Sequence, residues 1–209
     1  MTRLRRAESK NRTRERLLES AREMFAKNGF LGVSVDHIAE HAGYSKGAVY
    51  SNFKSKEALF LELLEERMSE EIGELRALLS RAASAEEIMH ALEEKYSSLE
   101  KQVTWCLLAA EFQLQAGRNP EFAAPFAALY RNQRKAIGQL VKLVAEKAGM
   151  PTPPNLDEVA TSLMALTHGI SLQRAADPRG VSAATAGKSL RLLLSAFLNK
   201  NVVAKGKNS

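Results

Sequence analysis

Apolar residues recur at helical spacing along almost the whole chain, and no stretch alternates apolar and polar residues as a half-buried strand would. A first helix is expected over about residues 12–27. Two short helices are expected next, because Ser34 and Ser45 can act as N-caps and Gly43 separates them. Ser55 can cap a long fourth helix, so the first quarter of the chain predicts three helices followed by a connection.

The same periodicity predicts five more helices farther along the chain. Ser84 and Glu87 have the spacing of a capping box, and the segment from Pro151 to Pro154 is the clearest linker. We therefore expect an all-α protein of about nine helices. Its predicted parts are an N-terminal domain at 1–56 with a helix-turn-helix at about 34–53, a connecting helix at 57–80, a larger helical domain at 81–200, and a disordered tail at 201–209.

The positive charge is concentrated at the start of the chain. Residues 1–56 hold 12 of the 30 Lys and Arg but only 6 of the 24 Asp and Glu, so the whole net charge of +6 lies there. A polyanion, most commonly DNA, is the partner that such a segment predicts, although a merely solvated basic terminus remains an alternative. The lone Cys106 excludes an internal disulfide, and no apolar run reaches the roughly 20 residues of a membrane span, so we expect a cytoplasmic protein.

The most informative segment is SVDHIAEHAGYSKGAVYSNFKSK, residues 34–56, where two short helices meet at a turn that contains glycine. A helix that enters the major groove must be short, narrow and free of acidic residues. Residues 45–53 meet these conditions, with small Gly47 and Ala48 and basic Lys46. Lys54 and Lys56 follow at the start of the fourth helix, where ammonium groups and backbone N–H groups can bind phosphate.

This segment, together with the first helix, resembles the N-terminal signature of the TetR (tetracycline-repressor) family over about residues 12–60, with Tyr44 as one departure. The resemblance implies a homodimeric transcriptional repressor that binds a palindromic double-stranded DNA operator and is no enzyme. It implies phosphate contacts for Tyr50, Lys54 and Ser34, and base-facing positions for residues 45–48. The predicted DNA-binding residues are Ser34, Ser45, Lys46, Gly47, Ala48, Tyr50, Lys54 and Lys56.

In this family the second domain typically pairs with itself and binds a small molecule, here expected to be apolar or aromatic. The candidate ligand-binding residues are Tyr96, Trp105, Leu108, Phe112, Phe126, Tyr130 and His168, with Glu111 as a further polar contact. Two apolar helix stripes could instead form the intrachain core, but the resemblance favours a dimer interface. Its candidate residues are Leu163, Ile170, Arg174, Leu190, Leu194 and Phe197.

Two alternatives remain. One is a DNA-binding regulator with no small-molecule effector, whose second domain only dimerises. The other is a metal-dependent hydrolase, because His37, Glu40 and His41 read as H-x-x-E-H and could share a helix face. Gly43 ends that helix at once and no distal ligand is identifiable, so we expect no catalytic residue, no metal and no cofactor.

Overall fold

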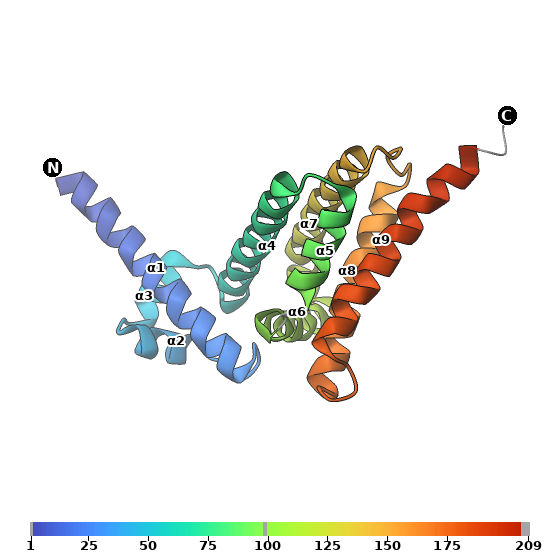
Figure 1. The fold of residues 1–209 in the computed structure, drawn as a ribbon. Helices are drawn as coiled ribbons and strands as arrows, with labels where there is room; N and C mark the ends of the chain where they lie inside the picture. The colour runs from blue at the N-terminus through green and yellow to red at the C-terminus, as the bar shows by residue number, and fades with distance from the viewer. Residues whose placement is uncertain (1, 98–99, 206–209) are drawn as a thin grey trace. The chain divides into compact units, whose positions relative to one another are not determined.

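The computed structural model describes residues 2–97 and 100–205, and it describes side chains within 8–97, 103–182 and 184–197. This part of the chain is all-α, as the sequence predicts, and contains nine helices (Figure 1). They are α1 (Thr2–Asn28), α2 (Val35–Ala42), α3 (Lys46–Asn52), α4 (Lys56–Arg81), α5 (Ala85–Tyr96), α6 (Glu100–Arg118), α7 (Pro120–Lys147), α8 (Leu156–Ala176) and α9 (Ala183–Lys205). None of the described helices is long and apolar enough to cross a membrane.

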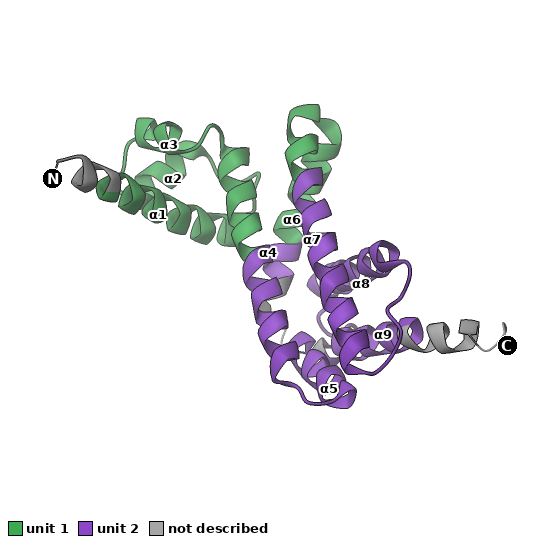
Figure 2. Ribbon diagram, turned by 90° about the horizontal axis from the view of Figure 1, so that it is seen from above, with its two compact units in different colours: residues 1–67, 107–126 green, residues 68–106, 127–209 purple. Residues whose placement is uncertain are grey.

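The chain forms two compact units, shown in different colours in Figure 2. Unit 1 comprises residues 1–67 and 107–126, and unit 2 comprises residues 68–106 and 127–209. The unit that contains the helix-turn-helix is therefore larger than the domain predicted at 1–56, because it includes most of α6 and the start of α7. Helix α9 also extends to Lys205, into the segment predicted as a disordered tail, and residues 206–209 lie outside the described part.

A cluster of phenylalanines forms the centre of unit 1. The ring of Phe30, in the turn between α1 and α2, lies 5.6 Å from Phe25, 5.0 Å from Phe60 and 5.1 Å from Phe112, measured between centroids. Phe60 and Phe112 are stacked at 5.0 Å, and Phe112 is fully buried. Aromatic pairs at these distances add to the free energy of area burial. The cluster therefore joins α1, α4 and α6 around the turn that leads into α2.

In unit 2, α5 and α8 both pack against α9. The backbones of α5 and α9 approach closely at Gly187, where a Cβ atom would lie 2.3 Å from the carbonyl oxygen of Glu93. Arg191, one turn farther along α9, forms an ion pair of 3.2 Å with the Glu93 carboxylate. The buried side chains of Leu190 and Leu194, also on α9, belong to the hydrophobic core of unit 2.

Candidate nucleic-acid interface

Local hydrogen bonds define the ends of α2 and α3 as the sequence predicts. The Ser34 hydroxyl accepts a hydrogen bond from the His37 N–H at 3.1 Å, and the Ser45 hydroxyl accepts one from the Ala48 N–H at 3.3 Å. Gly43 ends α2 in the left-handed conformation with φ +74°, which glycine adopts at little cost. Two caps and one glycine therefore bring two short helices together at a tight turn.

Helix α3 has one buried side and one exposed side. Val49 and Phe53 are buried in unit 1, whereas the Tyr50 ring is 51% exposed. Arg14 of α1 holds the end of α3, because its guanidinium lies 4.4 Å from the centroid of the Phe53 ring and donates to the Asn52 carbonyl at 2.9 Å. The same guanidinium forms an ion pair with Glu62 of α4. Neighbouring helices thus hold α3 in place before any ligand binds.

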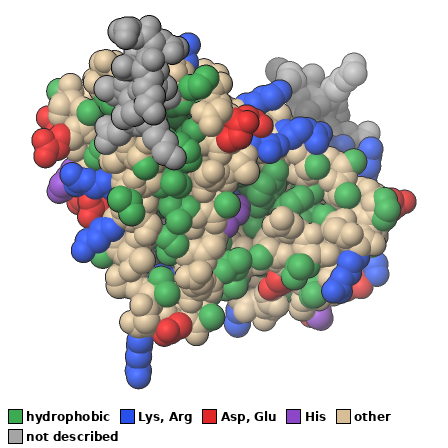
Figure 3. Space-filling view, turned by 90° about the vertical axis from the view of Figure 1, so that its right-hand side faces the viewer, with side chains coloured by type: hydrophobic (Ala, Val, Ile, Leu, Met, Phe, Trp, Pro, Cys, Tyr) green, Lys and Arg blue, Asp and Glu red, His purple; other side chains and the backbone are tan. Residues whose placement is uncertain are grey.

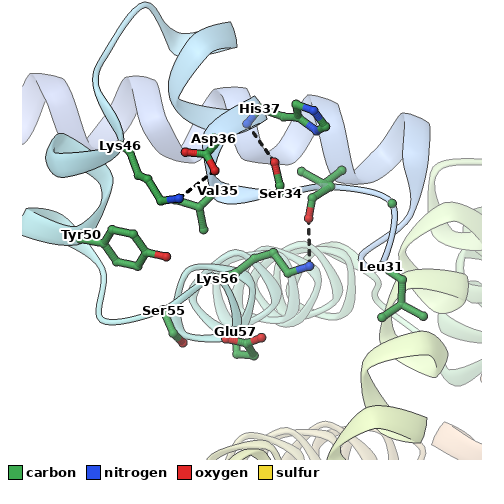
Figure 4. Close-up of a pocket in the computed structure, with 12 residues that line it drawn as sticks. Leu31, Ser34, Val35, Asp36, His37, Lys46, Tyr50, Ser55, Lys56 and Glu57 are labelled. Atoms are coloured by element: carbon green, nitrogen blue, oxygen red, sulfur yellow. Dashed lines mark hydrogen bonds and ion pairs between the residues drawn. The ribbon is translucent and has the colours of Figure 1, made fainter.

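The predicted DNA-binding residues divide by exposure. Ser45, Lys46, Gly47, Tyr50 and Lys54 are exposed, and Ser34, Ala48 and Lys56 are half-buried. A surface hollow of about 520 Å³ is lined by side chains from the start of α2, from α3 and from the start of α4 (Figure 4). Ser34, Lys46, Tyr50 and Lys56 all line it. The start of α4 adds backbone N–H groups and a positive helix end, which favour a phosphate group, whereas the carboxylates of Asp36 and Glu57 also line the hollow.

Lys56 has a structural role that the sequence did not indicate. Its ammonium group donates to the carbonyl oxygens of Phe30 at 3.0 Å and Val33 at 2.9 Å, and it lies 4.3 Å from the centroid of the Phe30 ring. Burial lowers the pKa of this amine. Two of its three hydrogens are therefore used within the protein, whereas the exposed Lys54 forms no ion pair with any described residue.

This difference predicts that loss of Lys56 destabilises the protein and that loss of Lys54 does not. We expect Lys56→Met to lower the free energy of unfolding by about 2 kcal/mol, because two carbonyls lose a charged donor. Lys54→Met, the matched control, should change it by less than about 0.5 kcal/mol. Urea unfolding followed by circular dichroism measures both, and equal midpoints for the two variants would contradict the role given to Lys56.

Helix α3 also carries an ion pair that no pattern in the sequence indicated. The Lys46 ammonium donates to the Asp36 carboxylate at 2.8 Å, and this bond joins the first turn of α3 to the first turn of α2 (Figure 4). The hydrogen bond to Asp36 raises the pKa of Lys46, and the negative charge of the Asp36 carboxylate raises it further. The two side chains are 55% and 60% exposed, so the pair adds little to stability.

The His41 side chain of α2 lies beside two residues of α1. His41 Nδ1 lies 3.0 Å from the buried Ser20 hydroxyl, and Nε2 lies 3.6 Å from the Glu23 carboxylate. The Ser20 hydroxyl donates its one hydrogen to the Ile38 carbonyl at 3.0 Å. His41 therefore joins α2 to α1. Among the described residues, no group of three or more His, Cys, Asp or Glu could hold a metal ion.

Glu111, considered above as a ligand contact, binds the protein's own backbone. Its carboxylate accepts the N–H of Phe30 at 2.8 Å, and a Cβ atom on Gly29 would lie 2.8 Å from the same carboxylate. The neighbouring Phe112 packs against both the Phe30 and the Phe60 rings. The structure thus gives Glu111 and Phe112 packing roles in unit 1, to which Leu108 and Phe126 also belong.

The other candidate ligand residues, Tyr96, Trp105, Tyr130 and His168, belong to unit 2. The Tyr96 hydroxyl lies 3.1 Å from the Glu71 carboxylate, to which it donates, and the Tyr130 and His168 rings lie 6.0 Å apart, edge to face. Burial lowers the pKa of His168, and the negative charge of Glu71 partly opposes this shift. Burial also raises the pKa of Tyr130. These aromatic and polar groups come from α4, α5, α6, α7 and α8.

The lowered pKa of His168 predicts a loss of stability in acid. The unfolded chain, with an ordinary histidine pKa near 6.5, binds this proton more readily than the folded chain, so stability should fall as pH falls below about 6.5. His168→Gln should reduce the loss of stability at low pH. His90→Gln is the control, because His90 is exposed. Thermal unfolding between pH 5 and 8 provides the test. Parallel curves for the wild type and His168→Gln would contradict it.

The candidate dimer residues are mostly internal in the single chain. Leu163, Ile170, Leu190 and Leu194 are buried in the core of unit 2, and Arg174 and Phe197 are half-buried. The buried four therefore have a packing role within their own chain. On the same two helices, Leu172 is 37% exposed and Leu192 is 74% exposed. Figure 3 views the molecule from the side on which α9 lies in Figure 1, and apolar side chains reach the surface there.

Both parts of the chain match models of known protein families. Residues 17–63 match the bacterial regulatory proteins of the tetR family, and residues 84–199 match the BetI-type transcriptional repressor C-terminal family. The transcriptional repressor AcnR of Corynebacterium efficiens is 32% identical over 115 residues, which cover 54% of this chain and 55% of that protein.

Solved structures agree with this assignment. A transcriptional regulator from Saccharomonospora viridis, in complex with choline, is 25% identical with a TM-score of 0.65, covering 91% of this chain and 97% of that chain. The regulator FadR of Bacillus subtilis, in complex with stearoyl-CoA, is 19% identical with a TM-score of 0.66, covering 86% of this chain and 96% of that chain. The second likeness concerns the fold alone.

Proposed function

Because the chain belongs to the TetR family of transcriptional regulators, which bind DNA and are not enzymes, we propose that it is a dimeric repressor. It binds a palindromic operator and releases it when a small apolar or aromatic effector binds. The observation that carries this proposal is the exposed side of α3, a helix with no acidic residue of its own, which Arg14 and the core of unit 1 hold in a fixed position. A rigid short helix of this kind suits the major groove.

Dimerisation follows from the small size of this surface, since one seven-residue helix contacts too few bases for specificity. With four of the candidate residues buried in their own chain, the exposed leucines of α8 and α9, Leu172 and Leu192, are better placed to meet a second copy. Two recognition helices related by a twofold axis then require a palindromic site.

For the effector, the aromatic and polar side chains of unit 2 around Tyr130 and His168 are the proposed binding region. Proteins of this fold have been solved with ligands as different as choline and stearoyl-CoA. Choline and stearoyl-CoA are therefore the first probes. A probe that binds this region should raise the unfolding temperature and weaken DNA binding together. A broad screen without any thermal shift would favour the regulator that has no effector.

Lys54 gives the direct test of phosphate contact. We expect Lys54→Ala to weaken binding to every DNA sequence and to lower the slope of log Kobs against log salt by about one, since one counterion fewer is released. Lys142→Ala, an exposed lysine on α7, is the charge-matched control and should leave the slope unchanged. An unchanged slope for Lys54→Ala would remove this residue from the DNA contacts.

A further inference from the structure

The ion pair between Lys46 and Asp36 places an acid on the face that the proposed function turns toward a polyanion. Asp36 is exposed at the second position of α2, and Lys46 is the first residue of α3. A lysine that served only as a phosphate contact would bind more tightly without a carboxylate 2.8 Å away. Stability does not account for the pair either, because exposed ion pairs contribute little.

The pair does provide a donor and an acceptor side by side on one surface. Lys46 Nζ has two hydrogens left after its bond to Asp36, and the carboxylate has lone pairs that this bond does not use. The major-groove edge of a G·C pair presents the complementary arrangement, with the guanine O6 and N7 acceptors beside the cytosine N4 donor. Lysine to guanine and aspartate to cytosine are both favourable contacts.

We propose, on the basis of the DNA-binding function above, that Asp36 and Lys46 act together as a specificity-determining pair that reads a G·C base pair in each half-site. Asp36 holds the ammonium group toward the guanine and accepts from the cytosine amino group. The same carboxylate repels phosphate, so it weakens binding to sequences that lack this base pair. At an A·T pair the thymine presents an O4 acceptor and a methyl group in place of the cytosine amino donor, so the carboxylate loses its hydrogen-bond partner.

The test is selection of bound duplexes from a pool with randomised half-sites, using the full chain and the variant Asp36→Asn. The wild type should select G·C at one position of each half-site. Asp36→Asn should lose roughly tenfold preference at that position, which corresponds to about 1.4 kcal/mol. It should bind scrambled DNA more tightly, with a salt slope steeper by about 0.9, because Lys46 becomes available to phosphate.

Glu40→Gln is the matched control, since Glu40 is exposed on the same helix and forms no ion pair with a described residue. It removes the same charge and should keep the selected base pair. In the double variant Asp36→Asn/Lys46→Ala, the gain on scrambled DNA should disappear. Asp36→Asn with the wild-type preference, or a Glu40→Gln variant that loses it equally, would overturn the proposal. Binding without any sequence preference would overturn the pair alone, and failure to bind any duplex would overturn the proposed function.

Discussion

Gly29→Ala should lower the free energy of unfolding by about 2–3 kcal/mol. Gly29 has a φ of +73°, where an alanine costs about 1 kcal/mol or more. The new Cβ would also lie 2.8 Å from the Glu111 carboxylate, which would have to move away from the Phe30 N–H that it now binds. Loss of a hydrogen bond to a charged acceptor adds a further cost of about 1.5 kcal/mol.

Gly43→Ala separates these two contributions. Gly43 has almost the same backbone conformation, with φ +74°, but nothing lies within 4 Å of its Cβ position. With both variants measured by urea unfolding, the free energy of unfolding of Gly43→Ala should fall by only about 1 kcal/mol. Adding Glu111→Ala to Gly29→Ala should then cost little more. Equal losses for the two glycine variants would show that Glu111 does not hold the turn.

Gly187→Ala should destabilise the chain by about 2–3 kcal/mol, although alanine is the better helix former. A Cβ atom at this position would lie 2.3 Å from the Glu93 carbonyl oxygen and 2.9 Å from the Ser97 hydroxyl. Helix α9 would have to move away from the backbone of α5, and forced repacking of this kind typically costs about 1–3 kcal/mol. Thermal unfolding should therefore show a lower midpoint.

Gly73→Ala on α4 is the control with the opposite sign. Gly73 is exposed in unit 2 and nothing lies within 4 Å of its Cβ position, so alanine should gain up to about 1 kcal/mol of helix stability. A stabilised Gly187→Ala variant would contradict the close packing of α5 and α9.

Signals that depend on neighbouring residues predicted the structure well. The N-caps Ser34, Ser45 and Ser84 form the expected hydrogen bonds to the third residue along. Gly43 ends α2 because a left-handed cap is a local property of the chain. Nine helices and the helix-turn-helix could therefore be placed from the sequence.

Contacts between distant residues could not be predicted in this way. Glu111 binds Phe30 across 81 positions, and Lys56 binds the Phe30 carbonyl across 26. No local pattern distinguishes these two residues from other charged helix residues. The stripe of Leu190 and Leu194 has the same period whether it faces its own core or a partner, so periodicity alone could not separate the two.

DNA binding through α3 and the start of α4, with a preference for particular sequences, can be measured by fluorescence anisotropy. The assay uses DNA from upstream of the protein's own gene, with scrambled DNA as control, across a salt series. We predict tight, salt-sensitive binding that prefers the upstream DNA and is weakened by Lys54→Ala. No binding to either DNA, even at low salt, would contradict a DNA-binding function for α3.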